Sequence, residues 1–568
     1  MNLTKINKKR ILVCFAIILI SLVSAIIQMK IFWPKGTVLG GDDIGFHLNR
    51  AFGLAEAIKT HHYPFYINDI LLNGYGYAEN WFYPNLFLFP MAILLNTGYS
   101  LAVSYKAYII FYTVITVCVT YYCIHKMSKR MYLSACTAIL YTFSLYRAFD
   151  VYQRAALGEA LAFIFFPVIL YGTYEILYGN KKKWYVLAIG FTGMLYSHVL
   201  SSVLAFIMLL LLLLFSINKL WEDKTKMLYF ILAGGVTVLL SAFFIFPMIE
   251  QMQSNTFYFN TNVLTNTYDQ AYTFEQIWRS IISDYKGSVI IGLGYTLFFP
   301  LIFRFTVKEK NDMIRFADKC LLITVILLFM TTKYFPWESL PILNVIQFPF
   351  RLYTIISLLL AFSGVVYMSY SIRKKFYKII LLFILLASSI GNAWTIAQPY
   401  KDFRMQDGNI KFKGNETYEN SYDIGAGLEY LPSVANIDDL KSRGKEEVRK
   451  KNSSTKVSNL SKENNELSLD FDTKSKDILE LPMVYYKGYQ AKVNGQNVPI
   501  KMSKNGLIEV EIQGKGTLEI SYPGTVIQKV SYYTSITVFI ILMAFITFVN
   551  IRNNKRKPNY DENRNVII

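Results

Sequence analysis

Residues 40–50 read GGDDIGFHLNR and follow shortly after a long apolar segment, residues 11–33. That segment exceeds the roughly 20 residues that a helix needs to cross a bilayer. Two adjacent carboxylates, a histidine and an arginine therefore stand just outside a predicted membrane span. We expect the rest of this apolar chain to form membrane helices that build a cavity over the polar stretch.

The bulk composition is typical of a multi-pass membrane protein. Of 568 residues, 53% are hydrophobic and 16% are aromatic, and several apolar runs reach the length of a span. The net charge of +19 comes from basic blocks between these runs, which is the pattern of cytoplasmic loops and argues against nucleic-acid binding. The cysteines lack metal-ligand spacing, so we expect no disulfide framework. They are Cys14, Cys118, Cys123, Cys136 and Cys320.

The basic blocks decide the predicted topology. Residues 8–10, KKR, precede the first apolar run, which we interpret as an uncleaved span that starts in the cytoplasm. The apolar run Leu86–Leu95 contains a proline and is too short to span. As an interfacial or re-entrant segment, it leaves every later basic block inside. Residues 34–85 then form an outer loop, and both termini are cytoplasmic.

We therefore predict a polytopic α-helical membrane protein with about twelve transmembrane helices. One helix over residues 184–217 would be too long for a bilayer at about 1.5 Å per residue, so we expect a hairpin turning at Ser197-His198 on the outer side. The predicted spans are 11–33, 103–124, 132–146, 157–178, 184–196, 199–217, 227–249, 289–305, 321–330, 352–370, 377–396 and 530–551.

The composition changes after the transmembrane domain, residues 1–397. Residues 398–528 lose the apolar runs and are rich in Lys, Asn, Ser, Glu and Gly. Strands are predicted at 484–493, 507–513 and 516–522, with turns at Asn494-Gly495 and Asn505-Gly506. We expect an all-β extracytoplasmic domain, a sandwich, with a mobile charged insertion at 441–466. Residues 529–568 form the last helix and a basic cytoplasmic tail.

This topology brings the unusual polar side chains to one face of the membrane. Charges near the hydrocarbon boundary cost about 2.5–3.5 kcal/mol on insertion scales, and they normally face a cavity or each other. Their concentration on the outer face is the observation that points to a site. They are Asp42, Asp43, His47, Arg50, Arg147, Asp150, Arg154, Glu159, His198 and Arg351.

The chemistry that suits these groups is glycosyl transfer from a polyprenyl-phosphate sugar to a cell-envelope polymer or lipid. Either Asp42 or Asp43 is the candidate general base on the acceptor hydroxyl. Arg351 and Arg154 are candidates for holding the donor phosphate, because a guanidinium matches phosphate oxygens in a bidentate geometry. Supporting roles fall to His47, Arg50, Glu159 and His198, and sugar or acceptor contacts to Tyr75, Tyr77, Trp81 and Tyr83.

Simpler explanations stand beside these roles. The aspartate pair is also suited to cap the helix predicted at 44–58, which contains an amphipathic stretch at 46–58, and His47 is spaced to pair with Asp43 on its face. Arg154 and Glu159 also fit a plain ion pair at a span end, and a structural role at the hairpin turn fits His198.

Two further alternatives concern the aromatic run and a metal. Residues 81–83, WFY, also fit an interfacial belt. Asp42, Asp43 and His47 offer ligands for one hard cation, but their spacing is no specific metal signature. We assign no metal or other cofactor and keep a divalent cation as the alternative.

Several motifs resemble known families. Residues 42–50, the GYGY run at 74–77 and the segments 154–167 and 347–351 resemble the membrane-protein family called 6-pyruvoyl-tetrahydropterin-synthase-related. Residues 422–432 and 481–495 are similar to YfhO-like bacterial membrane proteins. Residues 78–80 and 84–85 depart from the first pattern, since its members often carry prolines there.

Both families are related to the GT-C glycosyltransferase fold. That resemblance implies an acidic catalytic base in the first outer loop and a lipid-phosphate sugar donor. The rival prediction is a non-enzymatic transporter of lipid-linked saccharides or an assembly scaffold. A transporter is expected to carry polar groups near the midplane of several spans, and this sequence has few.

Overall fold

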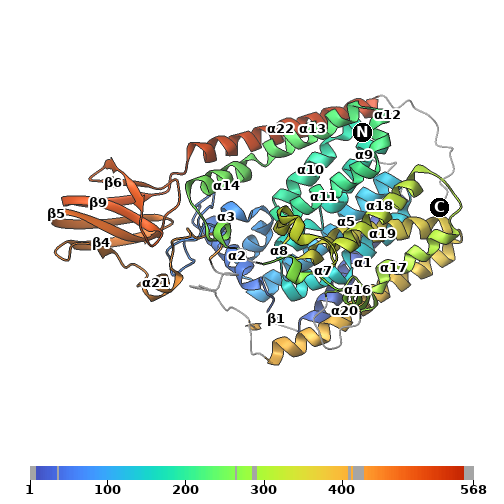
Figure 1. Cartoon of the computed structure of the whole chain (residues 1–568), viewed down its shortest axis with the longest axis horizontal. Coiled ribbons are helices and arrows are strands. Elements are labelled where there is room, and N and C mark those ends of the chain that lie inside the picture. Colours follow the sequence, from blue (N-terminus) through green and yellow to red (C-terminus); the bar gives the residue numbers. More distant parts are fainter. Residues whose placement is uncertain are drawn as a thin grey trace.

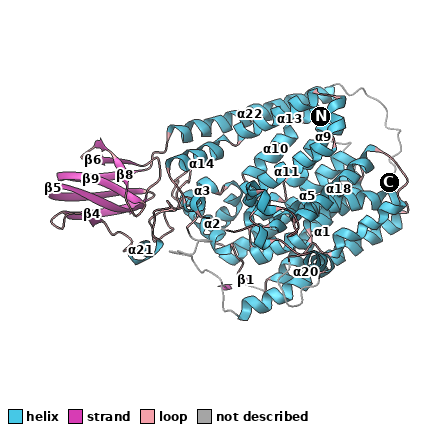
Figure 2. Ribbon diagram, in the orientation of Figure 1, coloured by secondary structure: helices cyan, strands magenta, loops and turns pink. Residues whose placement is uncertain are grey.

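A computed structural model describes residues 8–34, 37–262, 265–283, 291–406, 411–413 and 428–555. A bundle of helices forms one body, and a β-domain projects from one end of it (Figures 1 and 2). Three predicted features lie partly outside the described residues: the motif at 422–432, the start of the span at 289 and the basic tail.

Six helices in the described ranges are long and apolar enough to cross a membrane. The expectation of about twelve spans is therefore wrong by length and composition. The six are α1 (Lys8–Phe32), α5 (Leu101–Ser128), α8 with α9 (Leu157–Ala162, Phe166–Tyr178), η9 with α19 (Pro349–Leu352, Tyr353–Ser371), α20 (Lys375–Gln406) and α22 (Val526–Lys555).

The other predicted spans are shorter or broken. Helices α6 (Met131–Thr142) and α11 (Val199–Phe215) are apolar but fall below the length of the six. Helices α13 (Thr225–Leu240) and α14 (Ala242–Ser254) meet at a 71° bend, so they make a seventh candidate only as a broken span. Apolar composition alone did not reveal these interruptions, because a bent pair and a straight helix have the same hydropathy.

Three local predictions are confirmed in this bundle. The amphipathic stretch after the aspartates is α2 (Ile44–Lys59), and the run at 86–95 forms only η2 (Leu86–Leu88) and α4 (Phe89–Asn96). The chain also breaks at Ser197-His198, between α10 (Tyr185–Leu195) and α11.

The other helical segments of the described chain range from single turns to the 19-residue α18. They are α3 (Glu79–Phe82), α7 (Leu145–Ala148), η3 (Phe149–Arg154), η4 (Lys181–Lys183), α12 (Ile217–Glu222), α15 (Tyr258–Thr261), η5 (Tyr268–Gln270), α16 (Phe274–Ile282), α17 (Tyr295–Phe298), η6 (Phe299–Thr306), α18 (Asp312–Met330), η7 (Trp337–Ser339) and η8 (Pro341–Ile346).

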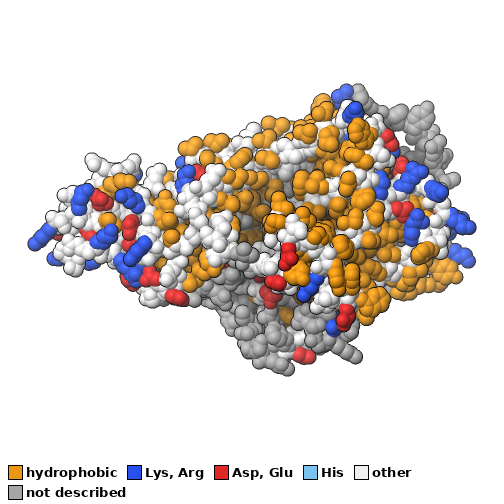
Figure 3. All heavy atoms as spheres, viewed as in Figure 1, with side chains coloured by type: hydrophobic (Ala, Val, Ile, Leu, Met, Phe, Trp, Pro, Cys, Tyr) orange, Lys and Arg blue, Asp and Glu red, His pale blue; other side chains and the backbone are white. Residues whose placement is uncertain are grey.

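Helix α19 is the centre of the bundle. It is apolar on all sides and buried along nearly its whole length, packing against α6, α18 and η6. A helix that is hydrophobic all round belongs inside a bundle. By contrast, α1 and α22 expose many large apolar side chains. Orange apolar side chains cover much of the surface of the helical body (Figure 3).

The β-domain is one hydrogen-bonded sheet rather than the predicted sandwich. Two long strands, β5 (Glu466–Val484) and β9 (Leu507–Ser521), form its spine and shift register near Thr473 and Asp477. The predicted strands at 507–513 and 516–522 are one strand, with Gly514 at a positive φ. The shorter strands are β3 (Arg449–Lys450), β4 (Lys456–Glu463), β6 (Gln490–Val493), β7 (Gln496–Val498) and β8 (Ile500–Met502).

Two predictions from the sequence of this domain can be compared with the sheet. Asn494 and Gly495 both have positive φ and turn β6 into β7, as an Asn-Gly hairpin requires. The stretch 441–466, expected to be a mobile insertion, instead carries β3 and β4. It looked unstructured because β4 alternates between exposed and only half-buried residues, so its sequence is almost wholly polar.

The outer loop and the β-domain share a hydrophobic core. Trp81 packs edge-on against Tyr486 of the β-domain, with ring centroids 5.3 Å apart, and both side chains are fully buried. The backbone N–H of Val484 donates to the carbonyl of Tyr75 at 2.8 Å. A two-stranded pair, β1 (Thr37–Leu39) with β2 (Lys411–Lys413), ties the loop down elsewhere.

Truncation of Tyr486 tests this interface. We expect Tyr486→Ala to lower the free energy of unfolding by about 3–5 kcal/mol, because it empties a buried aromatic site. Thermal unfolding of the detergent-purified protein measures the loss. Tyr533→Ala, which removes an exposed ring on α22, is the matched control and leaves the midpoint unchanged. Equal midpoints for the two variants would show that the β-domain is not held through this core.

Candidate functional site

Asp43 stands at the start of α2, and its carboxylate does not cap the helix. The structure shows no side-chain hydrogen bond from this residue to the first turn. Its backbone N–H instead donates to the carbonyl of Arg154 at 2.9 Å. Asp43 is half-buried, whereas Asp42 is exposed. Helix capping therefore does not explain why residue 43 is an aspartate. Asp42 and Asp43 also occupy different environments.

Gly41 allows this close approach of two distant segments. A Cβ atom at Gly41 would lie 2.6 Å from the Cβ of Ala155 and 3.0 Å from the carbonyl oxygen of Gln153. Any side chain at position 41 would push the acidic loop away from residues 153–155. The glycine before the aspartates thus serves the contact between the outer loop and the end of η3.

Glu159 is the centre of a buried ion cluster. Its Oε2 accepts from Nη1 of Arg154 at 2.9 Å and from Nε of Arg351 at 3.3 Å. Its Oε1 accepts from the hydroxyl of Tyr146. Arg154 also donates to Oδ1 of Asp150 at 2.9 Å. The two arginines predicted to act together are therefore brought together, and both are almost fully buried.

Burial and these charges act on Asp43 in opposite directions. Loss of hydration raises the pKa of the Asp43 carboxyl, while the nearby Arg154 and Arg351 guanidiniums oppose that rise. A raised pKa makes a carboxylate a better proton acceptor, provided that it stays ionised at the working pH. The environment of Asp43 is thus suited to a general base.

Arg50 clamps the end of the outer loop from α2. Its Nη2 donates to the carbonyls of Tyr83 and Pro84, each at 2.8 Å. Its guanidinium carbon lies 4.4 Å from the centroid of the Tyr83 ring. Nη1 lies 3.3 Å from Nδ1 of His47. Arg50 is fully buried, so it positions the Tyr83–Pro84 segment.

Both histidines of the cluster lie in surroundings that disfavour the charged imidazolium. His47 is buried, and the loss of hydration lowers its pKa well below the usual value. Burial also lowers the pKa of His198 to about 3. Nδ1 of His198 lies 2.8 Å from the hydroxyl of Ser201. The expected pairing of His47 with the Asp43 side chain gives way to the contact with Arg50.

Tyr83 connects the histidines to the ion cluster. Its ring centroid lies 5.3 Å from that of His47 and 5.6 Å from that of His198. A Cβ at Gly158 would lie 2.1 Å from the Tyr83 hydroxyl oxygen. The tyrosine hydroxyl therefore occupies space that only a glycine leaves open, one residue before Glu159.

The other aromatic candidates lie elsewhere. The Tyr75 hydroxyl donates to the carbonyl of Gly444 at 2.9 Å, and the Tyr77 hydroxyl accepts from the N–H of Tyr430 at 3.3 Å. Both rings are buried against the β-domain. Trp81 belongs to the same core and also lines a cavity described below. Of the four predicted sugar-contacting residues, Tyr83 alone borders the charged cluster.

Arg147 also departs from the predicted grouping. It donates to the carbonyl of Thr142 and the hydroxyl of Thr113, at 3.3 and 3.2 Å. No described carboxylate lies within ion-pair distance of this guanidinium. Arg147 packs inside the helix bundle, apart from Glu159.

Sequence reasoning missed two polar residues of the cluster. Tyr146 binds Glu159, and the side-chain oxygen of Gln347 accepts from Nη1 of Arg351 at 2.7 Å. Gln347 has a φ of 64°, which is uncommon for a residue other than glycine. Its place as a polar residue beside Arg351, just before the span predicted at 352–370, was the available signal.

The described residues include no group of three or more His, Cys, Asp or Glu side chains arranged to hold a metal ion. The cluster instead mixes carboxylates with arginines. Such a set suits a negatively charged substrate group, with the carboxylates orienting the guanidiniums.

Two comparisons with known proteins bear on this chain. Residues 435–531 match the family model "Bacterial membrane protein YfhO". The chain is also similar to an uncharacterized protein of Lactococcus lactis subsp. cremoris (strain MG1363), with 23% identity over 582 residues and 91% of each chain covered. The YfhO part of the resemblance is thus supported in the β-domain and the start of α22. The likeness to the tetrahydropterin-synthase-related family is unsupported.

Removal of the central charge tests the ion cluster. We expect Glu159→Gln to lower the free energy of unfolding by about 3–5 kcal/mol, because two buried guanidiniums lose their shared counter-charge. Glu222→Gln is the control, since it breaks an exposed pair with Lys219 worth about 0–1 kcal/mol. Thermal unfolding in detergent compares the two. Similar midpoints would contradict the central place of Glu159.

His198 makes stability depend on pH in a defined direction. The pKa of His198 in the folded protein lies below the usual 6.5. As the pH falls below 6.5, His198 therefore binds a proton in the unfolded chain but not in the folded protein. The protein then loses about 1.4 kcal/mol per pH unit through this residue. We expect His198→Asn to reduce the fall in unfolding temperature between pH 7.5 and 5.5. An unchanged fall would show that His198 is protonated in the folded state.

Proposed function

We propose that this chain is an integral membrane glycosyltransferase. It moves a sugar from a polyprenyl-phosphate donor to a cell-envelope polymer or lipid on the outer face. The observation that carries the proposal is the convergence of a half-buried carboxylate, Asp43, with two arginines that share Glu159. Residues 435–531 match the YfhO family of bacterial membrane proteins, which is consistent with a membrane location for this chemistry.

Asp43 rather than Asp42 is the proposed base. Its carboxylate makes no helix cap, burial raises its pKa, and the charges of Arg154 and Arg351 act on it. Asp42 is exposed to solvent at the same turn. Asp43 would accept the proton of the acceptor hydroxyl as that oxygen attacks the anomeric carbon of the sugar.

Arg154 and Arg351 would receive the leaving phosphate. As the bond between the anomeric carbon and the phosphate oxygen breaks, the electron pair stays on the phosphate and its negative charge grows. Guanidiniums stabilise such charge through short, charge-assisted hydrogen bonds. The Arg154 bonds to Asp150 and Glu159 both use Nη1, and a guanidinium carries five N–H donors in all.

Glu159 is a positioning residue in this scheme. It orients both guanidiniums through one carboxylate. Tyr146 donates to that carboxylate, and Gln347 accepts from Arg351. Preformed orientation matters because donors already aimed at the developing charge need no rearrangement during the reaction. The β-domain, packed on the outer loop beside Tyr75 and Tyr77, would orient the acceptor.

The two aspartates give the sharpest test. We expect Asp43→Asn to reduce kcat at least 100-fold, within the range of about 10²–10⁴ for loss of a general base. Asp42→Asn is the matched control and changes kcat less than threefold. The assay follows a radiolabelled sugar from polyprenyl phosphate to envelope acceptors in proteoliposomes.

Two results would overturn this assignment. Full sugar transfer by a well-folded Asp43→Asn variant would show that Asp43 is not the general base. The transporter hypothesis would be favoured if the wild-type protein moved the labelled lipid across the bilayer without transferring its sugar. Unfolding temperatures of both variants accompany the assay, so that loss of fold is separated from loss of chemistry.

A further inference from the structure

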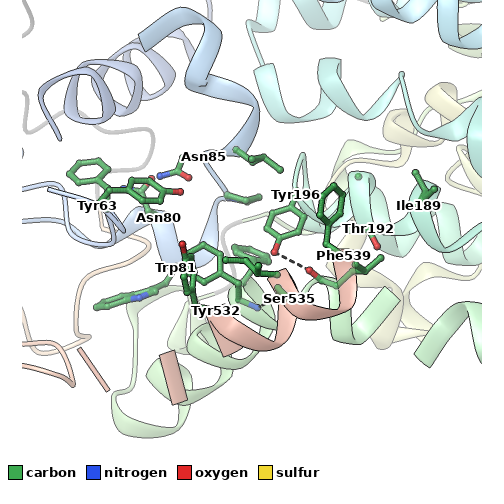
Figure 4. Close-up of a pocket in the computed structure, with 18 of the residues that line it drawn as sticks. Tyr63, Asn80, Trp81, Asn85, Ile189, Thr192, Tyr196, Tyr532, Ser535 and Phe539 are labelled. Atoms are coloured by element: carbon green, nitrogen blue, oxygen red, sulfur yellow. Dashed lines mark hydrogen bonds between the residues drawn. The ribbon is translucent and has the colours of Figure 1, made fainter. Parts of the chain in front are cut away.

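A cavity of about 610 Å³ lies between α10, α22 and the outer loop, and no residue of the ion cluster lines it. Helix α10, the bend between α13 and α14, helix α22 and the outer-loop segment 80–86 enclose it. Figure 4 shows Tyr196, Thr192 and Phe539 facing Trp81 and Asn80 across this space. Its volume falls in the range of about 300–1,000 Å³ that is common for small-molecule sites.

The lining of the cavity is apolar and aromatic. Among the described residues that line it there is no Lys, Arg, Asp or Glu. The Thr192 hydroxyl faces this region and has no hydrogen-bond partner in the described part of the protein. Ile189 and Phe539 line the cavity and are also exposed at the surface. Because α22 is a candidate membrane span, that surface faces the bilayer, and hydrocarbon is what surrounds the opening.

The cavity has polar side chains on its outer-loop wall, which contacts α2. Asn80 and Asn85 lie on its outer-loop wall, together with Pro84. The carbonyl of Pro84 accepts from Arg50 at 2.8 Å, and Arg50 follows Asp43 by two turns of α2, about 10 Å along the axis. The outer-loop wall of the cavity is thus connected to the helix that starts at Asp43 through the hydrogen bond between Arg50 and Pro84.

The charge of the lining separates two kinds of lipid. In a polyprenyl phosphate the phosphate is bonded directly to the chain, so its first polar group is an anion. The arginines suited to that anion are at Glu159, and the cavity itself has no cationic side chain among the residues described. The cavity therefore suits a lipid whose first polar part is neutral.

We propose that this cavity binds a hydrocarbon chain of the acceptor, an outer-leaflet lipid with a neutral head group. The inference rests on the proposed function for the role of acceptor, but the binding of the lipid is a separate property. The chain enters sideways from the bilayer between α10 and α22. The head group then projects past Asn80 and Asn85, under the β-domain, toward Asp43. Donor and acceptor reach the aspartate from different sides.

Photolabelling of the full-length protein in nanodiscs tests the binding. The probe is a diazirine-tagged monoglucosyl diacylglycerol, and the comparison probe is a diazirine-tagged polyprenyl phosphate. We expect the neutral probe to label peptides of α10 and α22 at least fivefold more than the phosphate probe. Predominant labelling of these peptides by the phosphate probe would overturn the assignment, as would labelling by neither.

A cavity-filling variant supplies the second measurement. Thr192→Trp should reduce labelling by the neutral probe at least fivefold. Leu214→Trp places the same side chain on an exposed, apolar position of α11 and should leave labelling unchanged. Equal labelling of both variants, with wild-type unfolding temperatures, would show that the lipid binds elsewhere. If Thr192→Trp does not fold, the wild-type comparison of the two probes still decides the proposal.

The Asp43→Asn variant separates this proposal from the proposed function. We expect it to lose sugar transfer yet retain wild-type labelling by the neutral probe. Labelling of α10 and α22 without transfer by any form of the protein would refute the glycosyltransferase and keep the lipid site. Transfer without such labelling would keep the enzyme and refute the site.

Discussion

The bonds from Arg154 and Arg351 to the Glu159 carboxylate are the interaction on which the rest of the site depends. They join the segment that carries η3 and α8 to the start of α19, the most buried helix of the bundle. Buried charges are tolerated only when they are paired and hydrogen-bonded. Tyr146, Asp150 and Gln347 complete that pairing. The positions of Arg154 and Arg351, the proposed donor-binding residues, are therefore coupled to the packing of the helical core.

The acidic loop is then held against this cluster by backbone contacts. Asp43 N–H bonds to the carbonyl of Arg154, and the Tyr400 hydroxyl donates to the carbonyl of Gly40 at 2.6 Å. Arg50 secures the far end of the loop at Tyr83 and Pro84. Since helix α2 connects these anchors, a displacement at either end would move Asp43 relative to the arginines. Aromatic side chains of the β-domain also pack against the same loop, as Tyr486 does against Trp81.

Much of the fold was predictable because it depends on local pattern. Hydropathy located the long spans, the amphipathic helix after Asp43 and the break at Ser197-His198, and an Asn-Gly pair located a hairpin. The predictions that failed depended on neighbours. The number of spans was too high because bends and short buried helices share the composition of full spans. The polar strand β4 looked disordered because its stability comes from pairing with β5.

By itself, the sequence determined that this is a largely apolar, helical chain with a polar loop after its first span and a β-rich segment before its last. Those properties follow from side-chain hydration and backbone preferences along a short stretch of chain. Tertiary structure decided the rest. It gave Asp43 and Asp42 different environments, brought Arg154 and Arg351 to one carboxylate, and made Tyr75 and Tyr77 core residues instead of the predicted sugar contacts. Residues 154 and 351 meet only through packing, and the pKa of a carboxylate depends on which charges and how little water surround it. Neither the contact between residues 154 and 351 nor the pKa of Asp43 can be predicted from the residues next to them in the sequence.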